Sequence, residues 1–260
     1  MVTSFPAVNQ VLELLLERAQ TTLREQFVGL YLYGSLATGD FDPASSDLDF
    51  AVVTATLLPP ETIPALENLH RELWASGLKW AAKLEGAYVP QNLLRRHDPT
   101  GPAIPAVNEG AFYLAQLGSD WVIQRHVLRE CGVVVAGPDP KTLIDPVSAD
   151  EIRQSIRGLL AEWWFPMLEN PAWLAERGSE YHAYAVISMC RVLHGLQHGT
   201  IVSKPVAARL AQANYPEWQL LIAQALAAQA GEKPGFFEAA LAFLRWIRAE
   251  IQAQNSQKLI

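Results

Sequence analysis

The chain has 260 residues, half of them apolar, with eight tryptophans and a net charge of −7. This length suits one large domain or two ordinary ones, and the apolar content supports a substantial core, which excludes a disordered chain. No run of about 18 uncharged apolar residues occurs, so we expect no membrane-spanning helix. The first residues lack the basic and apolar regions of a signal peptide, and the two cysteines are too few for a disulfide scaffold, so we expect a cytoplasmic protein.

The charge is unevenly distributed along the chain. Residues 1–150 carry 10 basic against 18 acidic side chains, a net −8, whereas residues 151–260 carry 10 against 9, a net +1. An acidic N-terminal half argues against a nucleic-acid partner, which needs lysine and arginine to displace phosphate counterions. It suits a cationic small molecule, although the simpler explanation is an acidic surface that keeps the protein in solution.

The N-terminal half combines helical and strand patterns. Apolar spacing predicts helices over 7–26, from about 61 to 75 and near 119–130. Strands are predicted near 28–33, 48–54, 84–89 and 133–135, and the segment 90–118, rich in proline, glycine and asparagine, is predicted as loop.

The C-terminal half has helical periodicity only. Asp145-Pro146 and the preceding Gly137-Pro138-Asp139-Pro140 form the predicted linker. Ser148 and Glu151 have the spacing of a capping box and open a helix that reaches about Leu168. Further helices are predicted at about 179–197, 204–213, 215–230 and 235–254. We therefore predict a mixed α/β domain with flanking helices over 1–146 and a helical bundle over 147–260.

One pair of motifs carries chemistry. Gly34-Ser35 forms a small turn directly after the first predicted strand, and Ser46 precedes the acids Asp47 and Asp49 at the start of the second. Alternate strand residues share a face, so the two carboxylates are expected to project together. Adjacent carboxylates repel each other unless a cation lies between them, and Mg²⁺ commonly fills this role together with substrate phosphates.

These motifs resemble those of a known family. The Gly34-Ser35 and Ser46-to-Asp49 motifs are similar to the signature of the polymerase-beta-type nucleotidyltransferase superfamily. Segments near the predicted linker and in the helical half resemble the streptomycin/spectinomycin (aminoglycoside) adenylyltransferases: 132–138, 145–146, 191–193 and 199–207. The resemblance implies a polymerase-beta-like domain and a helical domain, with Asp47 and Asp49 as Mg²⁺ ligands and Gly34, Ser35 and Ser46 near the triphosphate of ATP.

The same resemblance assigns roles to three further residues. Glu85 would be the general base towards the acceptor hydroxyl, Lys204 would contact phosphate, and Asp120 would lie near the adenosine. Each residue also has a simpler interpretation from its position alone. Glu85 is then an exposed strand residue, Lys204 an ordinary lysine at a helix start, and Asp120 an acid in the first turn of a helix.

The acceptor pocket is expected near a tryptophan that precedes the long helix of the second domain. Here the chain has Trp173, Glu176 and Glu180, where either carboxylate is suited to a guanidinium or an ammonium group. Both glutamates also fit exposed charges at helix ends. The stretch 173–182 is longer and differently spaced than in the family.

Other polar clusters have less specific patterns. His194 and His198 share a helix face as a zinc pair does, but no third ligand follows, so we favour exposed helix histidines. The segment 95–97 is interpreted as a solvated basic cluster, with a triphosphate contact as the alternative. Trp163 and Trp164 are interpreted as packing residues.

The leading hypothesis is an Mg²⁺-dependent enzyme that transfers AMP from ATP to a hydroxyl of an aminoglycoside or aminocyclitol. Its partners would be ATP and a cationic hydroxylated small molecule, with neither nucleic acid nor membrane, in a monomer or homodimer. The first alternative is the same chemistry on a non-antibiotic small molecule or a protein hydroxyl. The second is a catalytically silent nucleotide-binding module.

Overall fold

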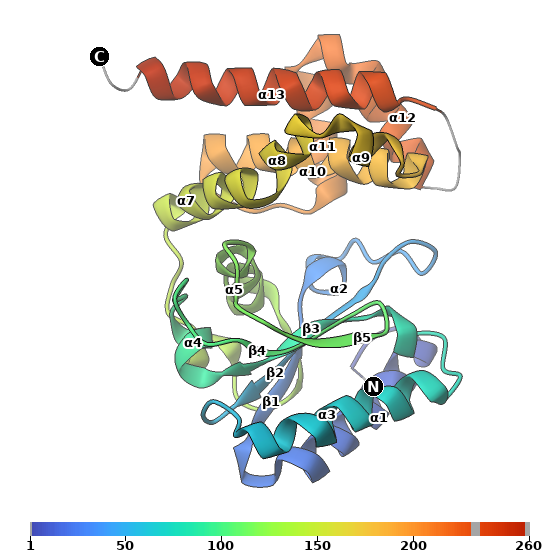
Figure 1. The fold of residues 1–260 in the computed structure, drawn as a ribbon, viewed down its shortest axis with the longest axis vertical. Coiled ribbons are helices and arrows are strands. Elements are labelled where there is room, and N and C mark those ends of the chain that lie inside the picture. The colour runs from blue at the N-terminus through green and yellow to red at the C-terminus, as the bar shows by residue number, and fades with distance from the viewer. Residues whose placement is uncertain (1, 230–234, 258–260) are drawn as a thin grey trace. The chain divides into compact units, whose positions relative to one another are not determined.

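The computed structural model describes residues 2–229 and 235–257. Its elements fall into two units, Met1–Val147 and Ser148–Ile260 (Figure 1). The first unit is built on a six-stranded sheet of order β5-β4-β3-β2-β1-β6. The strands are β1 (Phe27–Leu32), β2 (Leu48–Thr54), β3 (Leu84–Pro90), β4 (Ile104–Asn108), β5 (Ala111–Ala115) and β6 (Val133–Ala136). β2 and β3 are parallel and the other neighbours antiparallel, which makes the sheet mixed.

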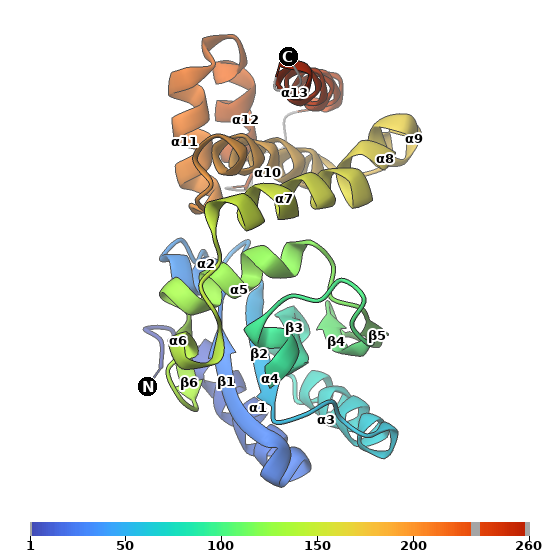
Figure 2. The ribbon, with the colours of Figure 1, turned by 90° about the vertical axis from the view of Figure 1, so that its left-hand side faces the viewer.

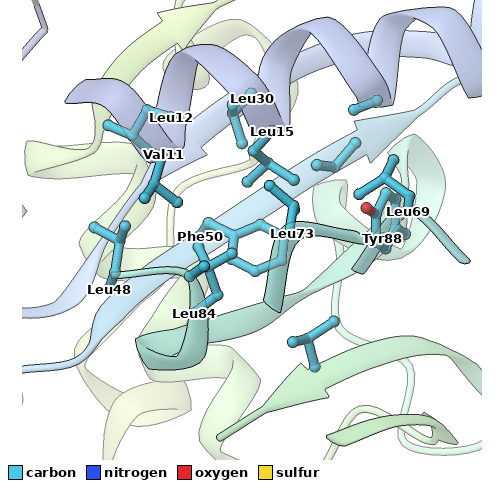
Figure 3. Close-up of a cluster of buried hydrophobic side chains, with 14 of the residues drawn as sticks. Val11, Leu12, Leu15, Leu30, Leu48, Phe50, Leu69, Leu73, Leu84 and Tyr88 are labelled. Atoms are coloured by element: carbon cyan, nitrogen blue, oxygen red, sulfur yellow. The ribbon is translucent and has the colours of Figure 1, made fainter. Parts of the chain in front are cut away.

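Helices cover this sheet. Those of the first unit are α1 (Pro6–Leu23), α2 (Gly34–Thr38), α3 (Ile63–Ala75), α4 (Gln91–Arg95), α5 (Asp120–Cys131) and α6 (Pro140–Leu143). The apolar faces of α1 and α3 pack on one side of β1, β2 and β3, where Leu15, Phe50 and Leu84 are fully buried (Figure 3). Full burial of each such side chain contributes about 1.5–3 kcal/mol. Because this face of β2 and β3 is buried in the core, a polar site on these strands must lie on their opposite face.

The prediction of a loop over 90–118 is wrong. The segment contains α4 and the hairpin of β4 and β5, which extends the sheet beyond β3. The hairpin turns at Glu109 and Gly110, both with positive φ (46° and 79°), the geometry of a two-residue turn that matches strand twist. Pro105 hid the strand pattern of β4; the proline is tolerated because it precedes Ala106 and Val107, the residues of β4 that pair with β3.

The second unit is a helical bundle around α10 (Ser179–His198), which packs against four other helices of the unit (Figure 2). These are α7 (Ala149–Leu159), α11 (Lys204–Asn214), α12 (Gln219–Gln229) and α13 (Phe237–Gln257). The capping box of Ser148 and Glu151 is present. The helix predicted to reach Leu168 is interrupted by a π-helical turn at Leu160–Trp164 before α8 (Phe165–Glu169), and α9 (Pro171–Ala175) follows.

The predicted fold class is confirmed: an α/β unit with a mixed sheet and flanking helices, followed by a helical bundle. In the part of the chain that the structure describes, none of the helices combines the length and the apolarity needed to cross a membrane.

A buried histidine lies inside the core of the first unit. His70 of α3 is fully buried, and its Nε2 lies 2.8 Å from the hydroxyl of Tyr88 on β3. Its ring stacks on Phe50 with centroids 6.0 Å apart. Burial lowers the pKa of His70 to about 4. The imidazole is therefore neutral in the folded protein at neutral pH.

This burial predicts an acid-sensitive core. Between pH 6.5 and about 4 the unfolded chain binds a proton at His70 that the folded chain does not. The contribution of the neutral His70 to the free energy of unfolding is therefore fully present above this pH window and is lost as the pH falls through it. We expect the free energy of unfolding to fall by about 2 kcal/mol from about pH 7.5 to about pH 5 through this residue. Urea unfolding at both pH values measures the loss, and hydrogen exchange of β2 and β3 peptides assigns it to the first unit.

His70→Gln should reduce this pH-dependent loss, whereas Ala65→Gln, a control at an exposed position of the same helix that changes no titratable group, should leave it unchanged. Because each variant is compared with itself at two pH values, a general loss of stability cancels. An undiminished loss in His70→Gln would contradict the assignment.

Candidate active site

Two carboxylates meet on neighbouring strands of the sheet. β2 and β3 pair in parallel with Asp49 opposite Glu85. Leu48, Phe50 and Leu84, which flank them, are buried in the core beneath α1 and α3. Strand alternation therefore turns Asp49 and Glu85 to the opposite face, where register partners on adjacent strands lie about 5 Å apart. The structure brings together the predicted metal ligand and the predicted base.

The turn after β1 is fitted against Asp49. Gly34 has φ of +60°, and a Cβ at this position would lie 1.8 Å from Oδ2 of Asp49. The N–H of Tyr33 donates to the carbonyl of Asp49 at 3.2 Å. Glycine is needed here both for the positive φ and for the space that the carboxylate occupies.

Asp47 already has a cationic partner. It precedes β2, and its Oδ1 accepts a hydrogen bond of 3.1 Å from Nζ of Lys83, at the end of a short 3₁₀ turn before β3. This hydrogen bond raises the pKa of Lys83. The side chain of Asp47 is 36% exposed, and such solvent-exposed pairs contribute at most about 1 kcal/mol. A divalent ion would compete with Lys83 for this carboxylate.

The two predicted phosphate-binding serines have different surroundings. Ser35 is the second residue of α2, and its carbonyl accepts the N–H groups of Gly39 and Asp40. The hydroxyl of Ser46 accepts the N–H of Asp42 at 3.0 Å, and its own N–H donates to the carbonyl of Asp42 at 2.8 Å. Ser46 therefore shapes the loop that leads to Asp47 and retains a hydroxyl proton to donate.

A cavity of about 180 Å³ opens beside Glu85. Residues of β3, β4, β5 and the start of α5 line it, and these elements are neighbours in Figure 1. Asp120, the first residue of α5, lines it together with Glu85, and Tyr33, Tyr113 and Trp121 supply aromatic walls. Among the described residues, the lining contains no lysine or arginine. The cavity thus combines two carboxylates with aromatic surface, which suits a cationic ligand.

Tyr33 reports on the charge in this region. It is buried, with 4% of its surface exposed, and burial followed by the carboxylates of Asp49, Glu85 and Asp120 raises its pKa well above its ordinary value. Burial, Glu85 and Asp120 also raise the pKa of Tyr113. Three of the acids predicted from the sequence therefore raise the pKa of one phenol, which remains neutral and lines the cavity beside Glu85 and Asp120.

The carboxylates fit an Mg²⁺ ion that is shared with substrate phosphates. Among the described residues, no three His, Cys, Asp or Glu side chains come together as a complete metal site. Mg²⁺ typically binds through one or two carboxylates together with substrate phosphates and water, not in a cage made by the protein alone. Asp47 and Asp49 supply hard oxygen ligands of this kind, so the residues present fit a magnesium ion that arrives with a nucleotide.

In the second unit, Lys204 lies on an aromatic ring. It is the first residue of α11, and its Nζ is 4.4 Å from the ring centroid of Tyr184 on α10. The role of Lys204 at phosphate stays a prediction, because this contact is with a ring of its own unit.

The residues predicted for the acceptor pocket form part of an aromatic cluster. Trp173 of α9 meets Tyr181 edge to face at 5.5 Å, and the guanidinium of Arg177 lies 4.2 Å from the ring centroid of Trp173. Glu176 and Glu180 are exposed at the end of α9 and the start of α10. Their roles towards an acceptor stay predictions; Glu180, at the start of α10, is also favourable there without a ligand.

The other polar clusters have structural explanations. The rings of His194 and His198 lie 4.7 Å apart, without a third metal ligand among the described residues. Arg95 and Arg96 both bind Asp145, at 3.0 Å and 2.6 Å, and these hydrogen bonds lower the pKa of that carboxyl. Both arginines thus tie α4 to the end of the first unit.

Sequence reasoning did not identify the aromatic wall of the cavity. Tyr33 is the last residue of the apolar run before the Gly34 turn, and this position directly beside the motif could have marked it as a residue of the site. Tyr113 lies on a strand that was taken for loop, and Trp121 directly follows Asp120. The ring of Trp121 lies 6.1 Å from that of Tyr33, which closes the wall.

Comparisons with known proteins agree with this geometry. Residues 14–96 match the nucleotidyltransferase domain family, and residues 142–245 match the family of the aminoglycoside adenylyltransferase C-terminal domain. The fold resembles a crystal structure of spectinomycin adenyltransferase AAD(9) from Enterococcus faecialis with ATP and spectinomycin. The TM-score is 0.72 at 17% sequence identity, over 94% of this chain and 99% of that one.

A second solved structure, a toxin-antitoxin with AMP-PNP, matches at a TM-score of 0.29 and 14% identity over 64% of this chain and 96% of that one. A likeness of that size indicates nothing about function. No curated protein sequence matches the chain significantly.

The fold, the paired carboxylates and the matched domains together define a nucleotidyltransferase, an enzyme that transfers a nucleotidyl group. Residues 14–96 thus carry a nucleotidyltransferase domain, and residues 142–245 carry the C-terminal domain of the aminoglycoside adenylyltransferases. The resemblance inferred from the sequence motifs is thereby confirmed.

The contact between Gly34 and Asp49 yields a direct prediction. Gly34→Ala places a methyl group where Oδ2 of Asp49 lies, so the carboxylate must move. A displacement of this kind costs about a hundredfold in turnover, measured as pyrophosphate release. Gly77→Ala is the matched control, because Gly77 also has a positive φ (+73°) but open space around its Cβ position.

Both variants should lose about 1–2 kcal/mol of stability through backbone strain, but only Gly34→Ala should lose activity. Equal activity of the two variants would show that the position of the Asp49 carboxylate does not matter for catalysis.

Proposed function

We propose that this chain transfers AMP from ATP to a hydroxyl of an aminoglycoside or aminocyclitol, with Mg²⁺. The observation that carries the proposal is the pairing of Asp49 with Glu85 beside an acidic cavity, on the face of the sheet opposite to the core beneath α1 and α3. The match of residues 142–245 to the aminoglycoside adenylyltransferase C-terminal domain supports the choice of donor and acceptor.

The proposed chemistry is a displacement at the α-phosphorus of ATP. The carboxylate of Glu85 accepts the proton of the acceptor hydroxyl, the oxygen forms a bond to the α-phosphorus, and the bond to pyrophosphate breaks. Asp47 and Asp49 would hold Mg²⁺, which offsets negative charge on the phosphates. Gly34, Ser35 and Ser46 bind phosphate oxygens, and we assign the ammonium of Lys204 to the same group of phosphates.

The acceptor is expected to be cationic because of the cavity lining. Glu85 and Asp120 face a space with aromatic walls, and the carboxylates attract an ammonium group while Tyr113 and Trp121 offer ring faces. In this proposal Asp120 contacts the acceptor, although the family resemblance places it near the adenosine. Trp173, Glu176 and Glu180 are proposed as further acceptor contacts from the second unit.

A panel assay tests donor and acceptor together. The enzyme is incubated with Mg²⁺, ATP or another nucleoside triphosphate, and single aminoglycosides or aminocyclitols, and the products are identified by mass spectrometry. We expect an acceptor heavier by one AMP group, together with pyrophosphate, and no product in excess chelator. Turnover only with another class of hydroxyl compound would contradict the acceptor but retain the chemistry, whereas ATP binding without turnover would contradict the enzyme mechanism.

Glu85→Gln tests the base. Glutamine retains the shape of the side chain but takes up no proton, so we expect kcat to fall by about 10²–10⁴-fold with little change in the affinity for ATP. Glu67→Gln is the matched control. Glu67 is exposed on α3, and α3 covers the side of the sheet opposite to the one that carries Glu85. A drop in affinity for ATP without a drop in kcat would assign Glu85 to nucleotide binding instead.

A further inference from the structure

Lys204 occupies an electrostatically unfavourable position. It is the first residue of α11, where the positive end of the helix dipole opposes a cation. The helix is already capped by Ser203, whose hydroxyl accepts the N–H of Val206 at 3.4 Å. Neither the cap nor the dipole explains a lysine at this position.

An aromatic ring compensates for that position. Nζ of Lys204 lies 4.4 Å from the ring centroid of Tyr184, well inside the range of a cation–π interaction. Tyr184 belongs to the central helix α10, and 37% of its surface is exposed. The ring therefore presents one face to the ammonium while it remains at the surface.

The ring of Tyr184 also contacts a buried tryptophan. Trp164 stacks on it with centroids 5.9 Å apart and planes inclined by 29°. Trp164 is 3% exposed and ends the π-helical turn Leu160–Trp164. The extra residue of such a turn changes the direction of the side chains that follow, and π-helical turns often occur at functional sites. Three elements, the π-helical turn, α10 and α11, thus contribute one residue each to the contacts of Tyr184 with Trp164 and with Lys204.

We propose that Tyr184 is a positioning residue that holds the Lys204 ammonium ready for a phosphate of the nucleotide. The proposal rests on the proposed function, in which Lys204 contacts the triphosphate. A flexible lysine side chain loses rotamer freedom when it binds phosphate, and a ring that already confines the ammonium reduces this loss. Tyr184 acts through Lys204 and not on the substrate.

The test measures binding of an ATP analogue with a methylene bridge between the α- and β-phosphorus, by calorimetry with Mg²⁺. Tyr184→Leu should weaken binding about two- to fivefold, the size of a partly exposed cation–π interaction. Tyr184→Phe should retain wild-type affinity, because the ring remains. In a Lys204→Met background, Tyr184→Leu should have no further effect.

Two controls separate positioning from folding. Tyr181→Leu removes a ring from the same helix and the same cluster, 5.6 Å from Tyr184, and should leave nucleotide affinity unchanged. Thermal unfolding verifies that each variant is folded. As a readout independent of nucleotide, acetylation of Lys204 by limiting acetic anhydride, followed by mass spectrometry, should be faster in Tyr184→Leu than in Tyr184→Phe.

The outcomes distinguish this proposal from the proposed function. If Lys204→Met weakens binding and Tyr184→Leu does not, the positioning role of Tyr184 is wrong and the function of Lys204 stands. If Tyr184→Leu weakens binding equally in the presence and absence of Lys204, the positioning role is also wrong, because the ring then affects nucleotide affinity without Lys204. If Lys204→Met leaves affinity unchanged, the phosphate contact of the proposed function fails, and the positioning role fails with it.

Discussion

The close fit between the Asp49 carboxylate and the Gly34 backbone is the contact on which the candidate site depends. It joins the turn after β1 to the start of β2, and the parallel register of β2 with β3 then places Glu85 beside Asp49. Any side chain at position 34 would displace the carboxylate, and a shift of register by one residue would turn Glu85 into the core. The geometry of the site is thus set by the packing of the strands that carry it.

The second constraint is electrostatic. Asp49, Glu85 and Asp120 all act on Tyr33, whose pKa they and its burial raise, while Lys83 partly neutralises Asp47. Grouped carboxylates of this kind destabilise one another unless cations are available. Mg²⁺ held between the carboxylates and the phosphates of a nucleotide would relieve that repulsion, and so would a cationic acceptor.

Local patterns predicted much of the fold, and their failures are physically informative. The strands 28–33, 48–54 and 84–89 and the capping box at Ser148 correspond to observed elements, because alternation, periodicity and caps are local properties. The hairpin of β4 and β5 was missed, since Pro105 obscures the strand pattern of β4; it is tolerated there because it precedes the residues of β4 that pair with β3. The π-helical turn before Phe165 was missed for a related reason: tertiary packing stabilises it, and helical periodicity does not reveal it.

The sequence by itself determined the class of chemistry, because a glycine-serine turn and two alternating acids place groups suited to phosphate and Mg²⁺ within about fifteen residues of chain. It also indicated Glu85 and Lys204, through resemblance to a family. Only the tertiary structure decided which groups surround these residues. That Asp120 and Tyr113 share a cavity with Glu85, and that Tyr184 and Trp164 support Lys204, depends on contacts between segments far apart in the chain, and such contacts leave no local pattern.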